Sequence, residues 1–537
     1  MGSSKKFKTY SQHQTSLFPT DLSTLVPEDH PVRVLNKIID QLDLTELLGE
    51  YSVRGASNFH PRMMLKVWIY GYLNNIYSSR KLEASLKENI YMMWLSGMQR
   101  PDHNTLNRLR SGKLKPHIKT IFFRIVRFLI AEDQVDLSVA YTDGTKIESK
   151  ANKYSFVWGK RIKKAKENME KRIEELWEYA ENQAADEFKD LRPTCFKPVS
   201  TEQVKTLAQQ IGQALKDKPV SKKVKQQLNY LEKTQAEKVD QYHVQEEILN
   251  GRNSYSKTDK DATFMRLKDD PMRNGQLKPA YNVQVSTQGE YAINYSTHQT
   301  AGDSTTLKTH YDQMAQGLGA YPDVAVADAG YGSEENYEYL KENDIESVVK
   351  YPGFHKEQRT KNRTGDFSTL NLYYHEQGNY LICPMGQKME CIGTRQQRTS
   401  TGFLQTIHVY RAKKCYDCPL RSSCFQSKYK YKKRTATLNL NLMAHRKKAR
   451  ENLTSTDGEQ LRKQRCAEVE QFFGQMKANK KFNRFLMAGM DKVGVELGLL
   501  FSAMNIMKYV RKIQKEAIKA FLAFIFGLFA SKSILKR

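Results

Sequence analysis

VDLSVAYTDG, at residues Val135–Gly144, is the stretch that decides the fold class of this 537-residue chain. Its apolar residues alternate with polar ones up to Asp143, which is the pattern of a β-strand with one buried face. Gly144 is expected to close that strand, and Thr145–Ser149 to form a second strand that completes a hairpin. Farther along, Asp323–Asp328 (DVAVAD) has the short apolar run of a buried strand and again ends in an aspartate. Each of these two strands therefore ends in a carboxylate.

The segments after the first strand alternate between β and α patterns. Tyr281–Thr287 and Tyr291–Thr297 each alternate apolar and polar residues, and a Gln288-Gly289 turn separates them. Two helices and a further short strand are expected around Ser304–Gln316, after Ser333 and near Val348. Strands and helices that alternate in this way predict an α/β domain.

The region before this domain has a helical pattern. Apolar residues within Pro27–Arg110 recur at the spacing of amphipathic helices. Its last part, RPDHNTLNRLR, has Asp102 or Asn104 as an N-cap and then Arg108 and Arg110 on the following turn. These two arginines could bind DNA phosphates, or they could lie on the solvated face of an ordinary helical bundle.

Residues from about 160 to 250 are highly charged and have the pattern of a helical arm. Ile162, Met169 and Leu176 are seven residues apart, which is the repeat of a coiled coil. Arg192–Pro198 interrupts this pattern before it resumes. The arm is either a support with a solvated basic face or a clamp on DNA.

The net charge of the chain indicates what kind of partner it binds, and its cysteine content indicates its cellular compartment. The chain has 86 Lys and Arg against 59 Asp and Glu, a formal net charge of +27, which favours a polyanion. Seven cysteines do not make a disulfide scaffold in a chain of this length, so a reducing, cytoplasmic compartment is expected. Met1–Tyr10 is polar and basic, unlike a signal peptide. The longest uncharged apolar run, Ala520–Ala530, is shorter than the roughly 20 residues of a membrane span, so no membrane partner is expected.

A third carboxylate that could join Asp143 and Asp328 lies in the helical segment Arg465–Lys477. Glu470 is adjacent to the apolar face of that segment, whereas Glu468 lies away from it. Carboxylate oxygens are the ligands that Mg²⁺ prefers, and two such ions about 4 Å apart stabilise an in-line phosphoryl displacement. Because Asp143 and Asp328 are 185 residues apart, their spacing does not establish that they meet. Each could simply cap a turn or a helix.

Five of the seven cysteines lie in the basic segment before this helix, four of them within Cys391–Cys424. Cys415 and Cys418 have Cys-x2-Cys spacing, and Cys424 and the more distant Cys383 could complete a tetrahedral, structural Zn²⁺ site. The alternative is that these are reduced, buried cysteines of a small β-rich insert.

Taken in order, these motifs resemble those of the DDE transposases of bacterial insertion sequences. The segments that carry the resemblance are RPDHNTLNRLR (100–110), YTDGTKIESKANKYSFVWGK (141–160), DPMRNGQLKPAYNVQVST (270–287), VADAGYGSEEN (326–336) and VEQFFGQMKANKKFNRFLMAGMDKV (469–493). The resemblance implies an RNase H-like catalytic domain, which is an α/β fold with a mixed sheet. It also implies that Asp143, Asp328 and Glu470 form the catalytic, metal-binding triad, with Mg²⁺ or Mn²⁺ as the cofactor.

Some families of this kind carry a Tyr-x2-Arg-x3-Glu-x6-Lys signature around the glutamate. Glu470 and Lys477 match the second half of this signature, whereas Cys466 stands at the arginine position and Lys463 at the tyrosine position. By the resemblance, Lys477 and Arg465, which is displaced by one residue, would bind phosphates near the end of the mobile element.

The expected domain order follows from the patterns and the resemblance together. An N-terminal tail (1–26) precedes a helical DNA-binding domain (27–130) and an RNase H-like catalytic domain (131–512). The catalytic domain carries the helical, coiled-coil arm (160–250) and the basic Cys-containing insert (351–450), and a C-terminal helix or tail (513–537) follows.

The activity that the resemblance implies is cleavage and joining of DNA. Such an enzyme binds double-stranded DNA at the element ends, cuts one strand and directs the resulting 3′-hydroxyl either across the duplex or to target DNA. It would act at the bacterial nucleoid as a homodimer on DNA, with the arm or Ala520–Ala530 as candidate contacts between copies. Two rivals remain, namely an RNase H-like nuclease without strand transfer and a DNA-binding protein derived from a transposase that has lost catalysis.

Overall fold

The computed structural model describes residues 21–51, 58–184, 196–197, 199–267, 275–358, 367–425, 427–429 and 431–534, without the side chains of residues 370 and 520–534. The chain divides into two compact units. The first combines Met1–Val135 with Gly494–Arg537, and the second is Asp136–Val493.

The first unit is helical in its described residues. Its elements are η1 (Leu22–Leu25), α1 (Pro31–Gln41), α2 (Thr45–Gly49), α3 (Pro61–Leu73), α4 (Ser79–Glu88), α5 (Ile90–Leu95), α6 (His103–Arg108), η2 (Leu109–Lys113), α7 (Ile118–Ala131) and most of α19 (Met490–Ile534). In α1 and α3 a proline takes the first helical position, where it costs no helical hydrogen bond. The imidazole Nδ1 of the preceding histidine accepts from the next backbone N–H, at 3.2 Å in both helices. The helical pattern predicted for this region is confirmed.

The segment around α6 shows which residue caps the helix. Oδ1 of Asp102 accepts a hydrogen bond of 2.6 Å from the backbone N–H of Thr105, so Asp102 is the N-cap. The π-helical turn η2 follows α6 and carries Arg110 into the core. There its guanidinium lies 4.2 Å from the centre of the Trp68 ring.

Helix α19 is long and apolar. Among the described residues, Met490–Lys519 is the one helical segment long and apolar enough to cross a membrane, and 83% of its most apolar window is buried in the structure. A buried core helix of a soluble protein meets the same criterion, so this segment is weak evidence for a membrane span. The side chains of Ala520–Ala530 lie outside the description.

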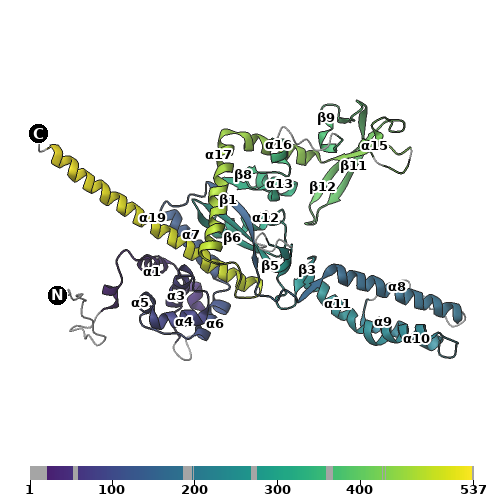
Figure 1. Ribbon diagram of the computed structural model, residues 1–537, viewed down its shortest axis with the longest axis horizontal. Coiled ribbons are helices and arrows are strands. Elements are labelled where there is room, and N and C mark those ends of the chain that lie inside the picture. Colours follow the sequence, from purple (N-terminus) through teal and green to yellow (C-terminus); the bar gives the residue numbers. More distant parts are fainter. Residues whose placement is uncertain are drawn as a thin grey trace, which may run out of the picture. The chain divides into compact units, whose positions relative to one another are not determined.

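The second unit is built around a six-stranded mixed sheet (Figure 1). Its strands are β1 (Val139–Glu148), β4 (Thr263–Arg266), β5 (Leu277–Gln288), β6 (Tyr291–His298), β7 (Val324–Ala327) and β8 (Glu346–Val349). The order is β5-β1-β7-β8, and both β4 and β6 pair with the remaining edge of β5. β5 is antiparallel to β1, whereas β7 and β8 continue the sheet in parallel. The predicted α/β class is confirmed.

Short helices and turns connect or cover these strands. They are α12 (Leu307–Leu318), η5 (Ala329–Tyr331), α13 (Glu334–Glu342), α14 (Phe354–Glu357), η6 (Thr369–Asn371), α16 (Leu440–Thr454), α17 (Thr456–Arg465), η7 (Cys466–Glu470), α18 (Gln471–Gly474) and η8 (Gln475–Asn479). Of these, η7 and η8 are π-helical turns within one continuous helical segment.

Strand β1 differs from the sequence expectation. It runs without interruption through Gly144 to Glu148, so the predicted hairpin of two short strands is wrong. Gly144 permits close packing instead of a turn, because a Cβ atom at this position would lie 2.5 Å from Nε2 of Gln284 on β5. A glycine inside a strand and a glycine that ends one leave the same local signal in the sequence.

The turn between β5 and β6 agrees with the sequence expectation. Gly289 and Glu290 form a two-residue loop in which both have positive φ, 54° and 57°. A two-residue hairpin loop with this geometry matches the twist of its strands, and glycine adopts it without strain. The predicted hairpin is confirmed.

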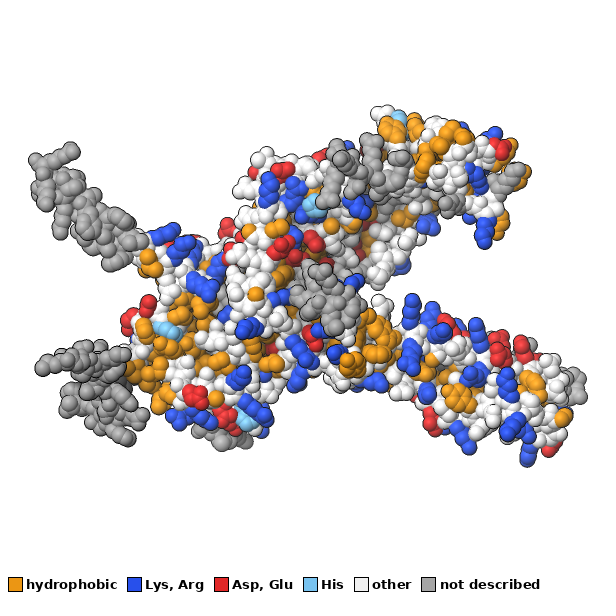
Figure 2. All heavy atoms as spheres, viewed as in Figure 1, with side chains coloured by type: hydrophobic (Ala, Val, Ile, Leu, Met, Phe, Trp, Pro, Cys, Tyr) orange, Lys and Arg blue, Asp and Glu red, His pale blue; other side chains and the backbone are white. Residues whose placement is uncertain are grey.

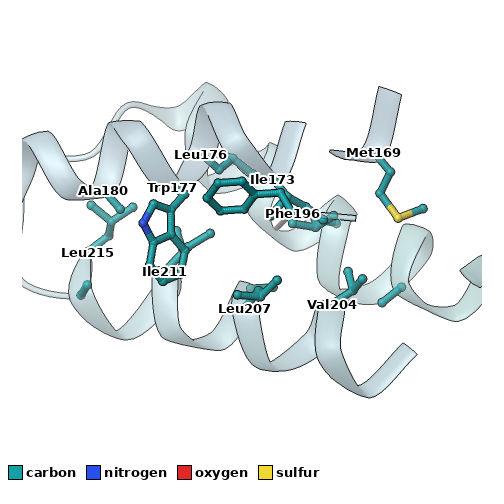
Figure 3. Packing of buried hydrophobic residues seen from close by; sticks show 14 of the residues in the cluster. Met169, Ile173, Leu176, Trp177, Ala180, Phe196, Val204, Leu207, Ile211 and Leu215 are labelled. Atoms are coloured by element: carbon teal, nitrogen blue, oxygen red, sulfur yellow. The ribbon is translucent and has the colours of Figure 1, made fainter. Parts of the chain in front are cut away.

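The arm is a bundle of helices inserted between two short strands. Strands β2 (Phe156–Trp158) and β3 (Ser254–Ser256) pair antiparallel at its base. The helices are α8 (Gly159–Gln183), α9 (Thr201–Ala214), α10 (Lys222–Tyr230), the π-helical turn η4 (Leu231–Gln235) and α11 (Ala236–Leu249). Figure 3 shows Trp177 of α8 among Ile211 of α9 and Phe196 of the connecting segment. The arm thus has a hydrophobic core of its own.

The basic insert forms a second, five-stranded sheet. Its elements are β9 (Tyr373–His375), β10 (Tyr380–Ile382), β11 (Lys388–Arg398), β12 (Leu404–Ala412), α15 (Arg421–Cys424) and β13 (Thr435–Leu438), in the sheet order β13-β12-β11-β10-β9. Glu334, buried at the start of α13, accepts a hydrogen bond of 2.7 Å from Nε2 of Gln405 on β12. This contact links the insert to the α/β sheet.

Replacement of Trp177 by Ala tests the core of the arm. The ring is fully buried, so we expect Trp177→Ala to lower the free energy of unfolding of the arm by about 3–5 kcal/mol. Limited proteolysis and thermal unfolding of the full chain measure this loss. Glu174→Ala, an exposed change on the same helix, is the control and should leave both measurements unchanged. Equal protease resistance of the two variants would contradict the prediction.

Candidate active site

Two aspartates follow neighbouring parallel strands at the same level of the sheet. β1 and β7 pair with Thr142 opposite Ala327, and Asp143 and Asp328 are the next residues along each chain. Adjacent strands lie about 4.8 Å apart, so the two backbones are neighbours at this point. The register therefore brings together two residues whose spacing in the sequence left the question open.

Each aspartate has one carboxylate oxygen held by a backbone N–H. Oδ1 of Asp328 accepts from Gly330 at 2.7 Å and caps η5, and Oδ1 of Asp143 accepts from Gly144 at 2.7 Å. Asp328 is thus both the cap of η5 and one of the two aspartates at the strand ends. Capping holds its carboxylate at the strand end and leaves Oδ2 without a bond to that turn.

A lysine extends the row of side chains onto the third parallel strand. Val349 of β8 lies opposite Ala327, so Lys350 follows β8 as Asp328 follows β7, and its backbone N–H donates to the carbonyl of Ala327 at 3.2 Å. Burial lowers the pKa of Lys350, and the charge of Arg465 lowers it further. The sequence analysis missed Lys350, whose only signal is its position directly after an apolar strand.

Arg465 joins the strands to the helical segment that carries the glutamates. The turn η7 packs against β1 and β5, and α17 against β7 and β8. Nη1 of Arg465 lies 3.0 Å from Oδ2 of Asp143, and Nη2 lies 3.5 Å from Oε1 of Glu470. The Arg465 side chain is only 8% exposed, so its contact with Asp143 is a buried ion pair.

The charges of the aspartates act on the pKa of Arg465. Burial by itself lowers the pKa of Arg465, but the charges of Asp143 and then Asp328 raise it above its ordinary value. The guanidinium therefore remains charged within the field of both aspartates. Among the described residues its Nε has no hydrogen-bond partner. Asp143, Asp328, Glu470 and Arg465, four of the predicted site residues, thus belong to one cluster.

The two glutamates of η7 are exposed in the opposite order from the one expected. Glu468 is 4% exposed, whereas the Glu470 side chain is 59% exposed. The expectation that Glu468 lies away from the buried face is therefore wrong. It assumed a regular α-helical period, and the π-helical turn adds a residue to the turn and changes which side chains face the sheet.

The buried carboxylate of Glu468 is hydrogen-bonded to the hairpin of β5 and β6. Its Oε2 accepts a hydrogen bond of 2.5 Å from the backbone N–H of Glu290 in the hairpin loop. Burial raises the pKa of the neighbouring Tyr141 to about 12, and the charge of Glu468 contributes to this increase. Glu468 is therefore close to the cluster, but its carboxylate is bonded to the hairpin, whereas Glu470 is ion-paired within the cluster.

Asp303 is a further carboxylate of the cluster, and the sequence analysis missed it. Its Oδ1 accepts hydrogen bonds from Nδ2 of Asn282 at 2.8 Å and from Nε2 of Gln284 at 3.0 Å. Cβ atoms at residues 144 and 330 would lie 2.8 Å and 3.4 Å from its carboxylate oxygens, so both glycines border it. Burial, followed by the charges of Asp303, Asp143 and Asp328, raises the pKa of Tyr331. Asp303 lies in a loop, where no apolar strand precedes it to mark it in the sequence.

The other predicted DNA-contact residues differ in exposure. Arg108 is exposed, whereas Arg110 is 4% exposed and donates to the carbonyl of Tyr77 at 2.7 Å. Lys477, in η8, is half-buried. Figure 2 shows further Lys and Arg side chains over the arm and the insert, with acidic side chains among those of the arm.

Neither of the metal sites expected from the sequence has a complete set of ligands among the described residues. Within the described part of the chain, no three His, Cys, Asp or Glu side chains are arranged so that they could hold a metal ion. At the acidic cluster Arg465 lies among the carboxylates. The cysteines at 383, 391, 415, 418, 424 and 466 are all free thiols without a disulfide, and Cys195 lies outside the described residues.

Comparison with known proteins identifies two segments of the chain. A family described as a transposase DDE domain matches residues 382–510, and one described as a transposase domain (DUF772) matches residues 20–112. The first match contains Arg465, Glu470 and Lys477, whereas Asp143 and Asp328 lie outside both matches. No curated protein and no solved structure matches the chain.

Both matches are to transposase domains, so they support a transposase. Together they support a DDE transposase of the insertion-sequence type, which is the family that the motifs resemble.

Replacement of Gly144 by Ala tests the packing beneath the cluster. The added Cβ would lie 2.5 Å from Nε2 of Gln284 and 2.8 Å from Oδ1 of Asp303, and these two groups are already bonded to each other. We therefore expect Gly144→Ala to lower the free energy of unfolding by about 1–3 kcal/mol. Chemical denaturation measures the change. Gly302→Ala is the control, because its Cβ would meet no atom within 4 Å. The prediction fails if both variants unfold at the same denaturant concentration.

Proposed function

We propose that this transposase binds the ends of its mobile element and catalyses metal-dependent DNA strand cleavage and strand transfer. The observation that carries the proposal is the pairing of β1 with β7, which makes Asp143 and Asp328 neighbours at the strand ends. Glu470 joins them through Arg465. Three carboxylates and a buried cation in one cluster suit the binding of a phosphodiester together with divalent cations.

The sheet supports an RNase H-like fold for the catalytic domain. Strands β1, β5 and β6 form an antiparallel meander, and β7 and β8 extend the other side of β1 in parallel. That order and these directions are those of an RNase H-like sheet. The central strand of such a sheet carries the first aspartate, which is the position of Asp143 on β1.

The carboxylates of the cluster are of the ligand type that a hard divalent cation prefers, although as described they do not form a complete ligand set. Asp143 and Asp328 offer carboxylate oxygens from a rigid sheet, and the largely exposed side chain of Glu470 offers another. Arg465 at present supplies the positive charge among them, and its Nε has no partner within the described structure. When bound, Mg²⁺ or Mn²⁺ would activate the attacking oxygen and stabilise the charge that develops on the phosphate.

The chain's own cations would orient the DNA strand at this site. Arg465 is anchored to Asp143, so its guanidinium is held in a fixed position near the reacting phosphate. Lys350, on the other side of Asp328, can donate to a non-bridging phosphate oxygen. Fixed cations of this kind lower the barrier because they are oriented before the reaction begins.

Contacts farther from the cluster would bind the rest of the DNA. Arg108 is exposed after the capped helix α6, and Arg161, Lys163 and Lys164 are exposed near the base of the arm. Such contacts bind the DNA backbone and fix its register without reading its sequence. Because strand transfer requires two element ends together, we expect a homodimer on DNA, with the arm or Ala520–Ala530 as the contact.

Loss of either strand-end aspartate tests the catalytic proposal. Asp143→Asn and Asp328→Asn remove a charge that a divalent cation needs, so we expect cleavage of labelled element ends to fall at least about 100-fold in Mg²⁺. A gel assay for cleaved and joined products measures both steps. Asp323→Asn, at the opposite end of β7 and exposed, is the matched control and should remain active. Glu470→Gln should behave like the aspartate variants, whereas Glu468→Gln should lose thermal stability more than activity.

The same assay separates the alternatives. Metal-dependent joining that both aspartate variants lose supports a transposase with this triad. Cleavage without joining in the wild type indicates an RNase H-like nuclease. Tight binding of the ends by wild type and variants, with no cleavage by either, contradicts the catalytic proposal and indicates a DNA-binding protein.

Lys350 provides a test of positioning by the third strand. We expect Lys350→Ala to reduce the cleavage rate by about 100-fold, because one preorganised donor near the phosphate is lost. Lys350→Arg should recover part of the rate, since it retains the charge. Lys356→Ala, an exposed lysine six residues farther along, is the control. Wild-type cleavage by Lys350→Ala would contradict this role.

A further inference from the structure

Two cysteines of the insert lie at the same end of its five-stranded sheet. β10 ends directly before Cys383, and β12 ends three residues before Cys415. β11 pairs antiparallel with both strands, so the register brings these strand ends together. Oε1 of Gln387, in the loop after Cys383, accepts a hydrogen bond of 3.2 Å from the backbone N–H of Lys414. The two loops are thus tied to each other next to both sulfur atoms.

Both sulfur atoms accept hydrogen bonds from the backbone. Sγ of Cys383 accepts from the N–H of Gln387 at 3.3 Å, and Sγ of Cys415 accepts from the N–H of Arg434 at 3.2 Å. Hydrogen bonds of this kind hold the ligating atoms of metal sites in a fixed orientation. The loop after Cys383 turns through Gly386, and the loop after Cys415 turns through Asp417, both with positive φ.

Arg434 brings a third cysteine to the same place. Its Nη1 donates to Sγ of Cys424 at 2.7 Å, while its backbone N–H bonds to Cys415. Arg434 is buried, so a positive charge already lies among these sulfur atoms. Cys418 lies between Cys415 and Cys424, at Cys-x2-Cys spacing from the former.

Cys391 belongs to the same insert and differs in its bonding. Its Sγ donates to the carbonyl of Gly393 at 3.7 Å. The three cysteines described above accept hydrogen bonds instead. Cys391 therefore serves as a control, because it lies in the same insert but differs in its hydrogen bonding from the three cysteines that could bind a metal ion.

We propose that Cys383, Cys415, Cys418 and Cys424 bind one structural Zn²⁺ at this end of the insert. Four sulfur ligands in tetrahedral geometry are the usual donor set of structural zinc. As described, the sulfur atoms do not form a closed ligand set. Binding would replace the Arg434 guanidinium beside Cys424 by the metal ion.

Because the hydrophobic core of the insert is small, a bound zinc ion would add to the stability of the insert. The buried hydrophobic residues of this core are Leu381, Met389, Tyr410, Ala412, Ala436 and Leu438, and the half-buried Cys383 and Cys415 pack against them. A core of this size supplies little stability, and small domains often add a metal. The zinc would hold the loops at one end of the sheet. The proposed zinc site is separate from the acidic cluster and is independent of DNA cleavage.

Metal analysis of the full chain tests the proposal. Protein purified without added metal and dialysed against a weak chelator is expected to hold about one zinc per chain by elemental analysis. Cys415→Ser and Cys424→Ser should lose most of this zinc. Cys391→Ser and Asp143→Asn should retain it, because the first changes a thiol outside the proposed ligand set and the second changes the acidic cluster.

A second measurement keeps the test decisive if the cysteine variants fail to fold. Wild-type protein in which Co²⁺ replaces zinc should show the visible absorption of a tetrahedral ion and intense thiolate charge-transfer bands. Folded wild type without bound zinc and without these bands would overturn the proposal. Zinc that is retained in Cys415→Ser and lost in Asp143→Asn would also overturn it, because the metal would then belong to the acidic cluster.

Discussion

The parallel pairing of β1 with β7 is the constraint on which the candidate active site depends. With Thr142 opposite Ala327, the next residue of each strand is an aspartate, and both aspartates lie at one level of the sheet. A shift of one residue would turn one carboxylate to the opposite face. The same register, continued to β8, adds Lys350 to the row. Backbone hydrogen bonds across three strands therefore determine which charged groups meet.

Arg465 is the cation that compensates the charge of these carboxylates. Two aspartates at neighbouring strand ends repel each other, and a guanidinium between them and Glu470 compensates their charge. Removing one member of a buried ion pair typically costs about 3–5 kcal/mol, because the other charge is left without a partner.

Local sequence signals succeeded where they report on local physics. The N-cap Asp102 and the Gly289 turn follow from bonds and dihedral angles within a few residues. Local sequence signals led to wrong predictions where tertiary packing determines the conformation or the burial of a residue. Gly144 lies inside a strand because Gln284 and Asp303 approach it closely, and Glu468 is buried because a π-helical turn changes the face of the helix.

The sequence by itself determined the α/β class, the helical N-terminal region, the family and the residues Asp143, Asp328 and Glu470 as candidates. Apolar periodicity and motif order carry that information, and both can be read along the chain. Only the tertiary structure decided that the two aspartates are neighbours and that Arg465, Asp303 and Lys350 belong with them. These residues come from separate elements, and strand register and side-chain packing bring them together over distances that no local pattern encodes.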